Sequence, residues 1–353
     1  MRGFAFSSIA FGIFTVLSSL AIYHLQIFDQ LSQPLFWTTS LINSPLKSNM
    51  SVARISRNVV KKVFAVEQAE GQGARVRRSI GSGALRNLTP FLMLDHFRDV
   101  GSGAGFPDHP HRGQATVTYM IQGSMNHEDS LGNKGSLLAG GVQWMCAGKG
   151  IIHAEMPVVG AGVPLPVGFQ LWVDLPKQYK MVEPSYQDLS PEGVPVAYPE
   201  GPEGPVSVRV ISGKSHGVES PVRPLGGCWY FHVKLDKKGS NIFQDIPANW
   251  TTFAYIFKGR VAVGDTPTAY ESYHTIVFSN EPEATGVSIT AEEDGTELIL
   301  IAGEPLDQPV FQYGPFVMNT KQEVEKALID YRSGSNGFEK AHIWKSEIGG
   351  LRD

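Results

Sequence analysis

Short runs of β-branched and aromatic residues, each closed by Gly, Asn or Asp, recur along the chain from residue 51 onward. Many short apolar runs between turn residues are typical of a β-sandwich or a β-barrel. Two runs resemble each other, TYMIQG at 118–123 and AYIFKG at 254–259. Each is followed by another apolar run, at 168–176 and 296–305 respectively. The pattern predicts an all-β fold with two β-barrels of similar size in tandem.

The expected boundary between the two barrels is the segment 191–208, PEGVPVAYPEGPEGPVSV. Its Pro, Gly and Glu content is typical of an exposed connection. We therefore expect the first barrel within residues 50–190 and the second within residues 209–353.

One helix is expected near the carboxyl end, at about residues 320–333. Thr320 and Glu323 have the spacing of a capping box, and Gly334 is placed to end the helix. The apolar residues that share one face at helical spacing are Val324, Ala327, Leu328 and Tyr331. We expect this face to pack on a barrel.

Residues 1–49 differ from the rest, because residues 3–28 contain no charged side chain and are long enough to span a bilayer. We consider an uncleaved membrane anchor, a signal peptide cut near Ala21 and a mitochondrial-type leader. Alternatively, Met50 is the true start. Localisation is therefore open: cytoplasm or nucleus for the folded body, and membrane association or organelle targeting if residues 1–49 are retained.

Composition and charge narrow the classes of partner. The 38 Gly and 23 Pro residues favour a turn-rich globular protein, and two cysteines supply no disulfide framework. Residues 1–62 hold six Lys and Arg against one Asp, a net +5, so the remainder carries −9 of the total of −4. Direct nucleic-acid binding is not expected of such an acidic body, because phosphate contacts require clustered basic side chains.

Candidate chemistry lies in FPDHPHRG at 106–113 and in IIHAEM at 151–156. Side chains two residues apart on a β-strand point to the same side. His109 with His111, and His153 with Glu155, therefore each form a pair on one face, and two facing strands would bring all four together. Three imidazoles and one carboxylate suit a divalent ion such as Fe(II), Mn or Ni. Four protein ligands leave two positions of an octahedral metal open for a substrate or O₂.

The remaining sequence features around this constellation receive plainer interpretations. Gly148 and Gly150 are expected to form a tight turn directly before the second ligand strand. His127, next to Glu128 and Asp129, is interpreted as part of a solvated hairpin turn. The histidines expected to be hydrogen-bonded structural residues are His96, His232 and His274.

Eight stretches now identify the chain as resembling the pirin family of the cupin superfamily, from about residue 55 to the carboxyl end. They are FPDHPHRG, HEDSLGN, VQWMCAGKGIIHAEMP, LWVDLP, MVEPSYQ, IAGEPLDQPV, GPFVMNT and WKSEIGG. The resemblance implies two cupin barrels, a bicupin, with one iron (Fe²⁺/Fe³⁺) per chain in the N-terminal barrel. The implied ligands are His109, His111, His153 and Glu155.

The chain also departs from the family pattern. Gln114 and Ala115 stand where the family usually has Phe and Glu, so Glu155 would be the sole acidic ligand. Gly141 replaces an Asp in a turn. Cys146 replaces a Thr and is a candidate for redox sensitivity. We expect these changes to affect substrate fit more than metal binding.

The resemblance implies two functions that share one site. The first is flavonol dioxygenation of quercetin-like compounds with O₂ and release of carbon monoxide, in which Glu155 acts as general base. The second is an iron-dependent, redox-sensing transcriptional co-regulator that binds a transcription factor in the nucleus. A third interpretation is a small-molecule role unrelated to flavonols. The candidates for lining a flavonol pocket are Phe106, Met120, Trp144, Met156 and Phe169, and for each of them a place in the hydrophobic core is the favoured alternative.

Overall fold

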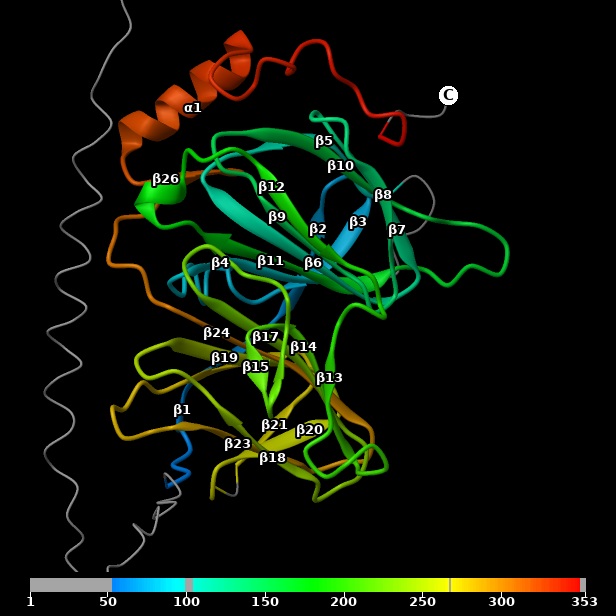
Figure 1. Ribbon diagram of the computed structural model, residues 1–353, viewed down its shortest axis with the longest axis vertical. Coiled ribbons are helices and arrows are strands. Elements are labelled where there is room, and N and C mark those ends of the chain that lie inside the picture. The colour runs from blue at the N-terminus through cyan, green and yellow to red at the C-terminus, as the bar shows by residue number, and fades with distance from the viewer. Residues whose placement is uncertain (1–52, 99–103, 267, 350–353) are drawn as a thin grey trace, which may run out of the picture. The chain divides into compact units, whose positions relative to one another are not determined.

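The computed structural model describes residues 53–98, 104–266 and 268–349. Figure 1 shows these residues as two β-barrels, with a helix beside the first barrel. Each barrel combines one seven-stranded sheet with one four-stranded sheet, and every pairing between the named strands is antiparallel. The expected all-β fold with a C-terminal helix is confirmed.

The first barrel is built mainly from residues between 66 and 189. Its larger sheet has the order β12 (Ser185–Leu189), β9 (Val142–Cys146), β6 (Gln114–Gln122), β11 (Val167–Asp174), β4 (Phe91–Phe97), β3 (Ala74–Arg78) and β2 (Val66–Glu70). Its smaller sheet has the order β5 (Phe106–His111), β10 (Ile151–Pro157), β7 (Ser124–Asp129) and β8 (Lys134–Leu138). A short 3₁₀ helix, η1, spans Lys177–Tyr179.

The second barrel repeats this plan. Its larger sheet has the order β1 (Val59–Phe64), β22 (His274–Phe278), β19 (Thr251–Lys258), β24 (Thr296–Gly303), β17 (Cys228–Leu235), β14 (Val206–Ser212) and β13 (Val196–Ala197). Its smaller sheet has the order β18 (Asn241–Asp245), β23 (Gly286–Ala291), β20 (Arg260–Val263) and β21 (Ala269–Glu271). Two small hairpins pair β15 (Lys214–Ser215) with β16 (Val218–Glu219), and β25 (Phe311–Tyr313) with β26 (Phe316–Met318).

The strand pairings differ from the expected boundaries at the beginning of the body and in the linker. Strand β1 lies within the range 50–190 expected for the first barrel, yet it pairs with β22 of the second. The buried Arg57 just before it donates to the Pro247 carbonyl at 2.9 Å and to the Thr252 hydroxyl at 2.9 Å. The expected linker 191–208 contains β13 and the start of β14, which pair with each other. Strand partners are set by contacts between distant segments, so composition did not reveal them.

Residues 305–349, called the C-terminal segment below, return from the second barrel to the first. Their helix α1 spans Lys321–Ser333, with the Thr320 side chain accepting a hydrogen bond from the Glu323 amide and with Gly334 in the left-handed conformation. Both predicted ends of the helix are thus confirmed. The helix packs against the first barrel through an apolar cluster that joins Ile152 to Phe316, Ala327 and Phe338.

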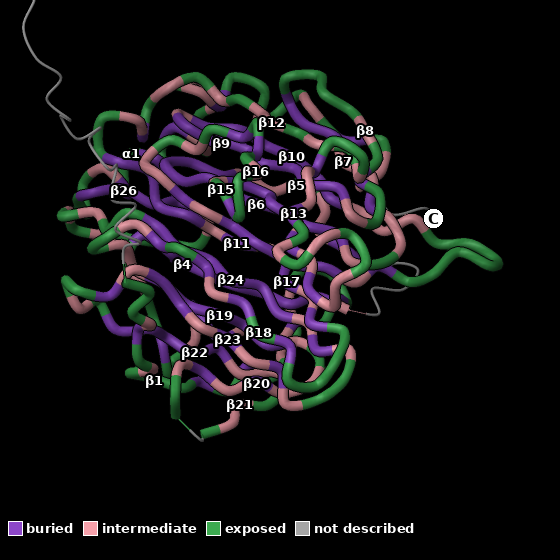
Figure 2. Tube along the Cα trace, turned by 60° about the horizontal axis from the view of Figure 1, so that its bottom comes forward, coloured by how far each residue is buried: buried purple, intermediate pink, exposed green. Residues whose placement is uncertain are grey.

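The two largest hydrophobic cores of the described residues organise the body, and buried residues follow the strands of both barrels in Figure 2. One core fills the second barrel, and the other lies where the two larger sheets meet. Within that contact, the His232 ring bonds both to the Tyr119 hydroxyl, at 2.8 Å, and to Glu297, at 3.2 Å. Burial by itself would raise the pKa of Glu297, but hydrogen bonds from His232 and Lys258 outweigh it and lower the pKa to about 2.

Candidate metal centre

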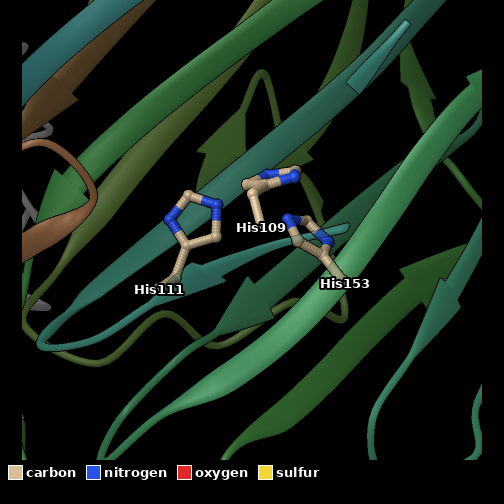
Figure 3. Close-up of side chains that lie close together, drawn as sticks. All are labelled: His109, His111 and His153. Atoms are coloured by element: carbon tan, nitrogen blue, oxygen red, sulfur yellow. The ribbon is translucent and has the colours of Figure 1, made fainter. Parts of the chain in front are cut away.

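Neighbouring strands β5 and β10 bring the three predicted histidines together. The antiparallel register places His153 opposite His109, and Ile151 opposite His111. Figure 3 shows the three rings converging, with centroids 4.4 to 5.0 Å apart. One nitrogen from each ring lies within 4.8 Å of the others, a grouping that could hold a metal ion. The prediction that these histidines meet is confirmed.

Glycines before β10 shape the turn that leads to His153. Gly148 has φ +46° and Gly150 has φ +147°, and the Gly150 amide donates to the Ala147 carbonyl at 2.9 Å. A Cβ on Gly148 would lie 2.1 Å from the Val182 carbonyl oxygen. Only glycine fits this backbone, so the predicted tight turn is present.

Burial keeps the three imidazoles neutral and therefore able to bind a metal. It lowers the pKa of His109, and it lowers the pKa of His111 and of His153 well below the usual value. The His109 Nδ1–H donates to the Pro107 carbonyl at 2.7 Å, which leaves the lone pair on Nε2. A neutral imidazole with one nitrogen fixed by a backbone carbonyl is the usual form of a histidine ligand.

His153 gives an independent test of whether a metal fits. His153 is 2% exposed, and neither of its ring nitrogens has a hydrogen-bond partner among the described residues. Buried polar atoms are nearly always paired, because leaving one unpaired costs about 1 to 3 kcal/mol. A metal bound to one of these nitrogens would remove part of that cost. The three-imidazole donor set fits a first-row divalent metal.

Glu155 lies near the three histidines, but its carboxylate oxygens are not among the candidate ligand atoms that lie within 4.8 Å of one another. The pairing register of β10 with β5 shifts between His153 and Glu155. The Glu155 carboxylate accepts hydrogen bonds from Thr118 Oγ1 at 2.8 Å and from Gln170 Nε2 at 3.0 Å. Burial raises the pKa of this carboxyl group, although both hydrogen bonds oppose the rise. Its role as a fourth ligand stays a prediction.

A cavity of about 1130 Å³ opens beside the cluster, and His109, His111 and Glu155 line it. Of the five candidates for lining a flavonol pocket, Phe106 lines this cavity. Met120, Trp144 and Phe169 belong to hydrophobic cores, which was the favoured alternative for them. Met156 is not among the lining residues, and its sulfur lies close to the Cα of Gly105, 2.8 Å from where a Cβ would stand.

Most of the cavity wall consists of residues that no sequence pattern indicated. The apolar residues that line it besides Phe106 include Val76, Leu92, Met93, Phe97 and Trp172. The Trp172 ring meets the His111 ring edge to face, with centroids 5.2 Å apart. Trp172 follows Gln170 by two residues on β11, so alternation along that strand could have placed both on the cavity side. The remaining wall residues come from strands distant in sequence and carried no comparable signal.

Part of the wall is polar. Arg78 Nη2 lies 2.6 Å from Glu70 Oε2 and 2.6 Å from Asp95 Oδ2. Burial raises the pKa of Asp95 to about 6, although Arg78 opposes the rise. The C-terminal segment adds further residues, from Val310 to Pro315, so both ends of the folded body contribute to the cavity.

The other histidines have structural roles, with one correction. His127 lies within β7, opposite Glu155, and not in a hairpin turn. The turn follows at Asp129, whose Oδ1 accepts from the amides of Leu131 and Asn133. The alternation of Met125 and His127 with polar neighbours was the missed strand signal. His96, His232 and His274 each make a hydrogen bond to a protein group, as predicted.

The four departures from the family pattern occupy different environments. Ala115 and Cys146 face each other across β6 and β9 and belong to the core between the barrels. A carboxylate at position 115 would thus lie in that core. Burial raises the pKa of the Cys146 thiol, which disfavours the thiolate and argues against redox sensitivity. Gly141 lies in a turn, where its amide donates to the Leu138 carbonyl. Gln114 contacts the site directly.

The predictions for residues 1–49, including a membrane anchor at residues 3–28, fall outside the described residues. Among the residues that the structure does describe, no helix has the length and apolar content needed to cross a bilayer.

Comparison with known proteins supports the resemblance. The family model described as Pirin matches residues 73–173, and the model described as Pirin C-terminal cupin domain matches residues 230–337. Human "Pirin" is 46% identical over 298 residues, which cover 83% of this chain and 99% of the human protein. "Pirin-like protein 2" of Arabidopsis thaliana is 44% identical over 308 residues, covering 86% and 92%.

A solved structure shows the same fold. The structure described as "Quercetin 2,3-dioxygenase from Acinetobacter baumannii" superposes with a TM-score of 0.72 at 31% identity. The match covers 79% of this chain and 98% of the bacterial one. Because both family models match, the relatives are similar over most of the chain and the body consists of two cupin-type barrels, the chain belongs to the pirin family.

Proposed function

We propose that this protein is an iron-dependent dioxygenase that opens the heterocycle of a flavonol such as quercetin. The observation that carries the proposal is a cluster of three neutral histidines, with His111 and His153 buried and His109 half-buried, at a cavity of about 1130 Å³. A cavity of this size is large enough for a three-ring flavonol. The name of the similar Acinetobacter structure supports the choice of substrate.

His109, His111 and His153 would hold one iron per chain, with Glu155 as a fourth ligand. A bound Fe(II) would supply a Lewis acid next to the substrate, and the flavonol itself would supply the electrons that reduce O₂. In the overall reaction, one flavonol and one O₂ would give one carbon monoxide and one ester-linked carboxylic acid. Two carbon–carbon bonds of the heterocycle break, the carbon between them leaves as carbon monoxide, and both atoms of O₂ stay in the ester product, so no other reductant is needed.

Glu155 would take the proton of the substrate hydroxyl group. Its pKa is raised by burial, which moves a carboxylate toward the range in which it accepts a proton efficiently. Thr118 and Gln170 hold the carboxylate in place by donating to its two oxygens. Trp172 and Phe106 offer apolar faces on the cavity wall against which flat rings can pack.

The test is metal analysis of the purified protein followed by O₂ uptake and carbon monoxide release with quercetin. We expect about one equivalent of iron and quercetin-dependent uptake. Both should be lost in His153→Ala and kept in the matched control His274→Ala, since His274 lies on β22 of the second barrel. Glu155→Gln should slow turnover by about 100-fold or more if this carboxylate is the base.

Two results would contradict the proposal. Iron without O₂ uptake across several flavonols would remove the dioxygenase reaction and favour the predicted redox-sensing transcriptional co-regulator. The metal centre itself would be ruled out if the wild-type protein took up no iron. It would also be ruled out if His153→Ala took up as much iron as the wild type.

A further inference from the structure

Gln114 connects one histidine of the cluster to the C-terminal segment. It is the first residue of β6, and its side chain is completely buried. Its Nε2 donates to His111 Nδ1 at 3.0 Å and to the Pro315 carbonyl at 3.1 Å. Its Oε1 is buried and has no hydrogen-bond partner within the described residues. One amide group therefore serves two parts of the molecule and leaves its acceptor unused.

This arrangement does not suit a metal-bound His111. Figure 3 shows the other ring nitrogen of His111, Nε2, turned toward His109 and His153, so Nε2 is the atom that a metal would bind. With Nε2 bound to metal, the ring proton must be on Nδ1, which then needs a hydrogen-bond acceptor. The Gln114 Nε2 group cannot accept a hydrogen bond from Nδ1–H. The unused Oε1 of the same side chain can accept it after the amide group has rotated about the Cγ–Cδ bond.

We infer that Gln114 is the positioning residue of His111 and that it couples metal binding to the C-terminal segment. The inference rests on the proposed metal site. When the amide turns to accept from Nδ1–H, its N–H groups leave the Pro315 carbonyl. The segment remains docked, because the Arg112 amide still donates to Pro315 O at 3.2 Å and the Val317 amide to Arg112 O at 3.0 Å. Metal binding thus removes one of several hydrogen bonds there.

The consequence reaches the cavity, because Phe311, Gln312 and Pro315 form part of its wall. Metal binding therefore weakens the docking of the C-terminal segment at this wall. By thermodynamic reciprocity, a ligand that favours the undocked segment increases the metal affinity by the same factor. One net hydrogen bond corresponds to a factor of about five. The phenylalanine usual at this position in the family has no hydrogen-bonding group, so the coupling is specific to chains with Gln114.

The experiment uses the full chain with Co(II) as the probe metal, in the wild type, Gln114→Leu and Gln114→Glu. Visible absorption of Co(II) reports its affinity and coordination, and hydrogen exchange reports the stability of residues 311–319. In the wild type, Co(II) should speed exchange in this segment about fivefold. Gln114→Leu should bind Co(II) about tenfold more weakly with an altered spectrum, and metal should no longer change its exchange.

Gln114→Glu separates positioning from a general packing defect. A carboxylate accepts from Nδ1–H but cannot donate to Pro315, so Co(II) should bind at least as tightly as in the wild type. Exchange of residues 311–319 should already be fast without metal and should stay unchanged on loading. This variant keeps the side-chain length, so it tests the inference even if Gln114→Leu folds poorly.

Three outcomes would overturn the inference. Wild-type affinity and spectrum in Gln114→Leu would show that Gln114 does not position His111, while leaving the proposed function intact. If Co(II) did not change the hydrogen exchange of residues 311–319 in the wild type, the coupling would be ruled out. If the wild-type protein bound no Co(II), as is expected of the His153→Ala variant, the metal site and the inference would be overturned together.

Discussion

The buried guanidinium of Arg112 is expected to hold α1 on the first barrel, and its replacement by methionine tests this. Arg112 is 1% exposed and donates from all three nitrogens: to the Lys149 carbonyl at 2.6 Å, to Asp330 Oδ2 at 2.8 Å and to the Asn336 carbonyl at 2.5 Å. It also stacks on the Phe338 ring, 4.7 Å from the centroid. Methionine keeps most of the side-chain volume and removes every donor.

The magnitude follows from what the substitution leaves behind. Asp330 is 3% exposed, so the variant buries a carboxylate without its main counter-charge. Breaking a buried ion pair by removing one partner typically costs about 3 to 5 kcal/mol. Two carbonyl acceptors also lose their donors. We expect Arg112→Met to lower the free energy of unfolding by about 4 kcal/mol.

Urea-induced unfolding, followed by fluorescence and circular dichroism, measures the change. Asp330→Leu should cost a similar amount, and the double variant with Arg112→Met should cost about 2 to 3 kcal/mol less than the sum of the two. The matched control is Arg75→Met, which breaks an exposed pair with Glu67 and should cost less than about 1 kcal/mol. A loss at Arg112 no larger than in this control, or additive single variants, would refute the reasoning.

Three further predictions concern other parts of the body. Glu297→Gln should destabilise the protein by about 1 to 2 kcal/mol at pH 7, because the pKa of Glu297 is about 2 when folded and solvent around the exposed Lys234 and Lys258 screens part of the effect. The difference in stability from the wild type should shrink as pH falls below about 4.5 and vanish near pH 2 in urea titrations. Gly113→Ala should cost more than about 2 kcal/mol in the same assay, since φ is +76° and a Cβ would lie 2.0 Å from the Val317 carbonyl oxygen; a neutral result would contradict this. Cys146 and Cys228 should react with iodoacetamide at least about tenfold more slowly in the native than in the unfolded protein, because burial raises the pKa of both thiols.

The core of the candidate site could be predicted from the sequence because it depends on local geometry. His109 and His111 are two apart on one strand, so the pleat alone puts their side chains on the same side. The turn glycines before His153 and the caps of α1 are likewise short-range features, set by φ angles and by side chains within four residues.

Other features were decided by contacts between segments far apart in the chain. Strand β1 joins β22 across about two hundred residues, and no local pattern specifies that partner. The hydrogen-bond partners of the Glu155 carboxylate, Thr118 and Gln170, come from β6 and β11, and no local pattern specifies them.

The sequence by itself determined the all-β class, the helix ends and the shared face of His109 and His111, because these follow from backbone periodicity and neighbouring residues. The pairing of β10 with β5, which brings His153 to the other two histidines, depends on the tertiary structure. Only the tertiary structure decided which barrel each strand joins, which side chains line the cavity and what Gln114 contacts, since Gln114 and Pro315 are brought together by the return of the C-terminal segment. Such contacts depend on how whole sheets pack, and packing free energy is shared among many distant residues rather than recorded in any short stretch.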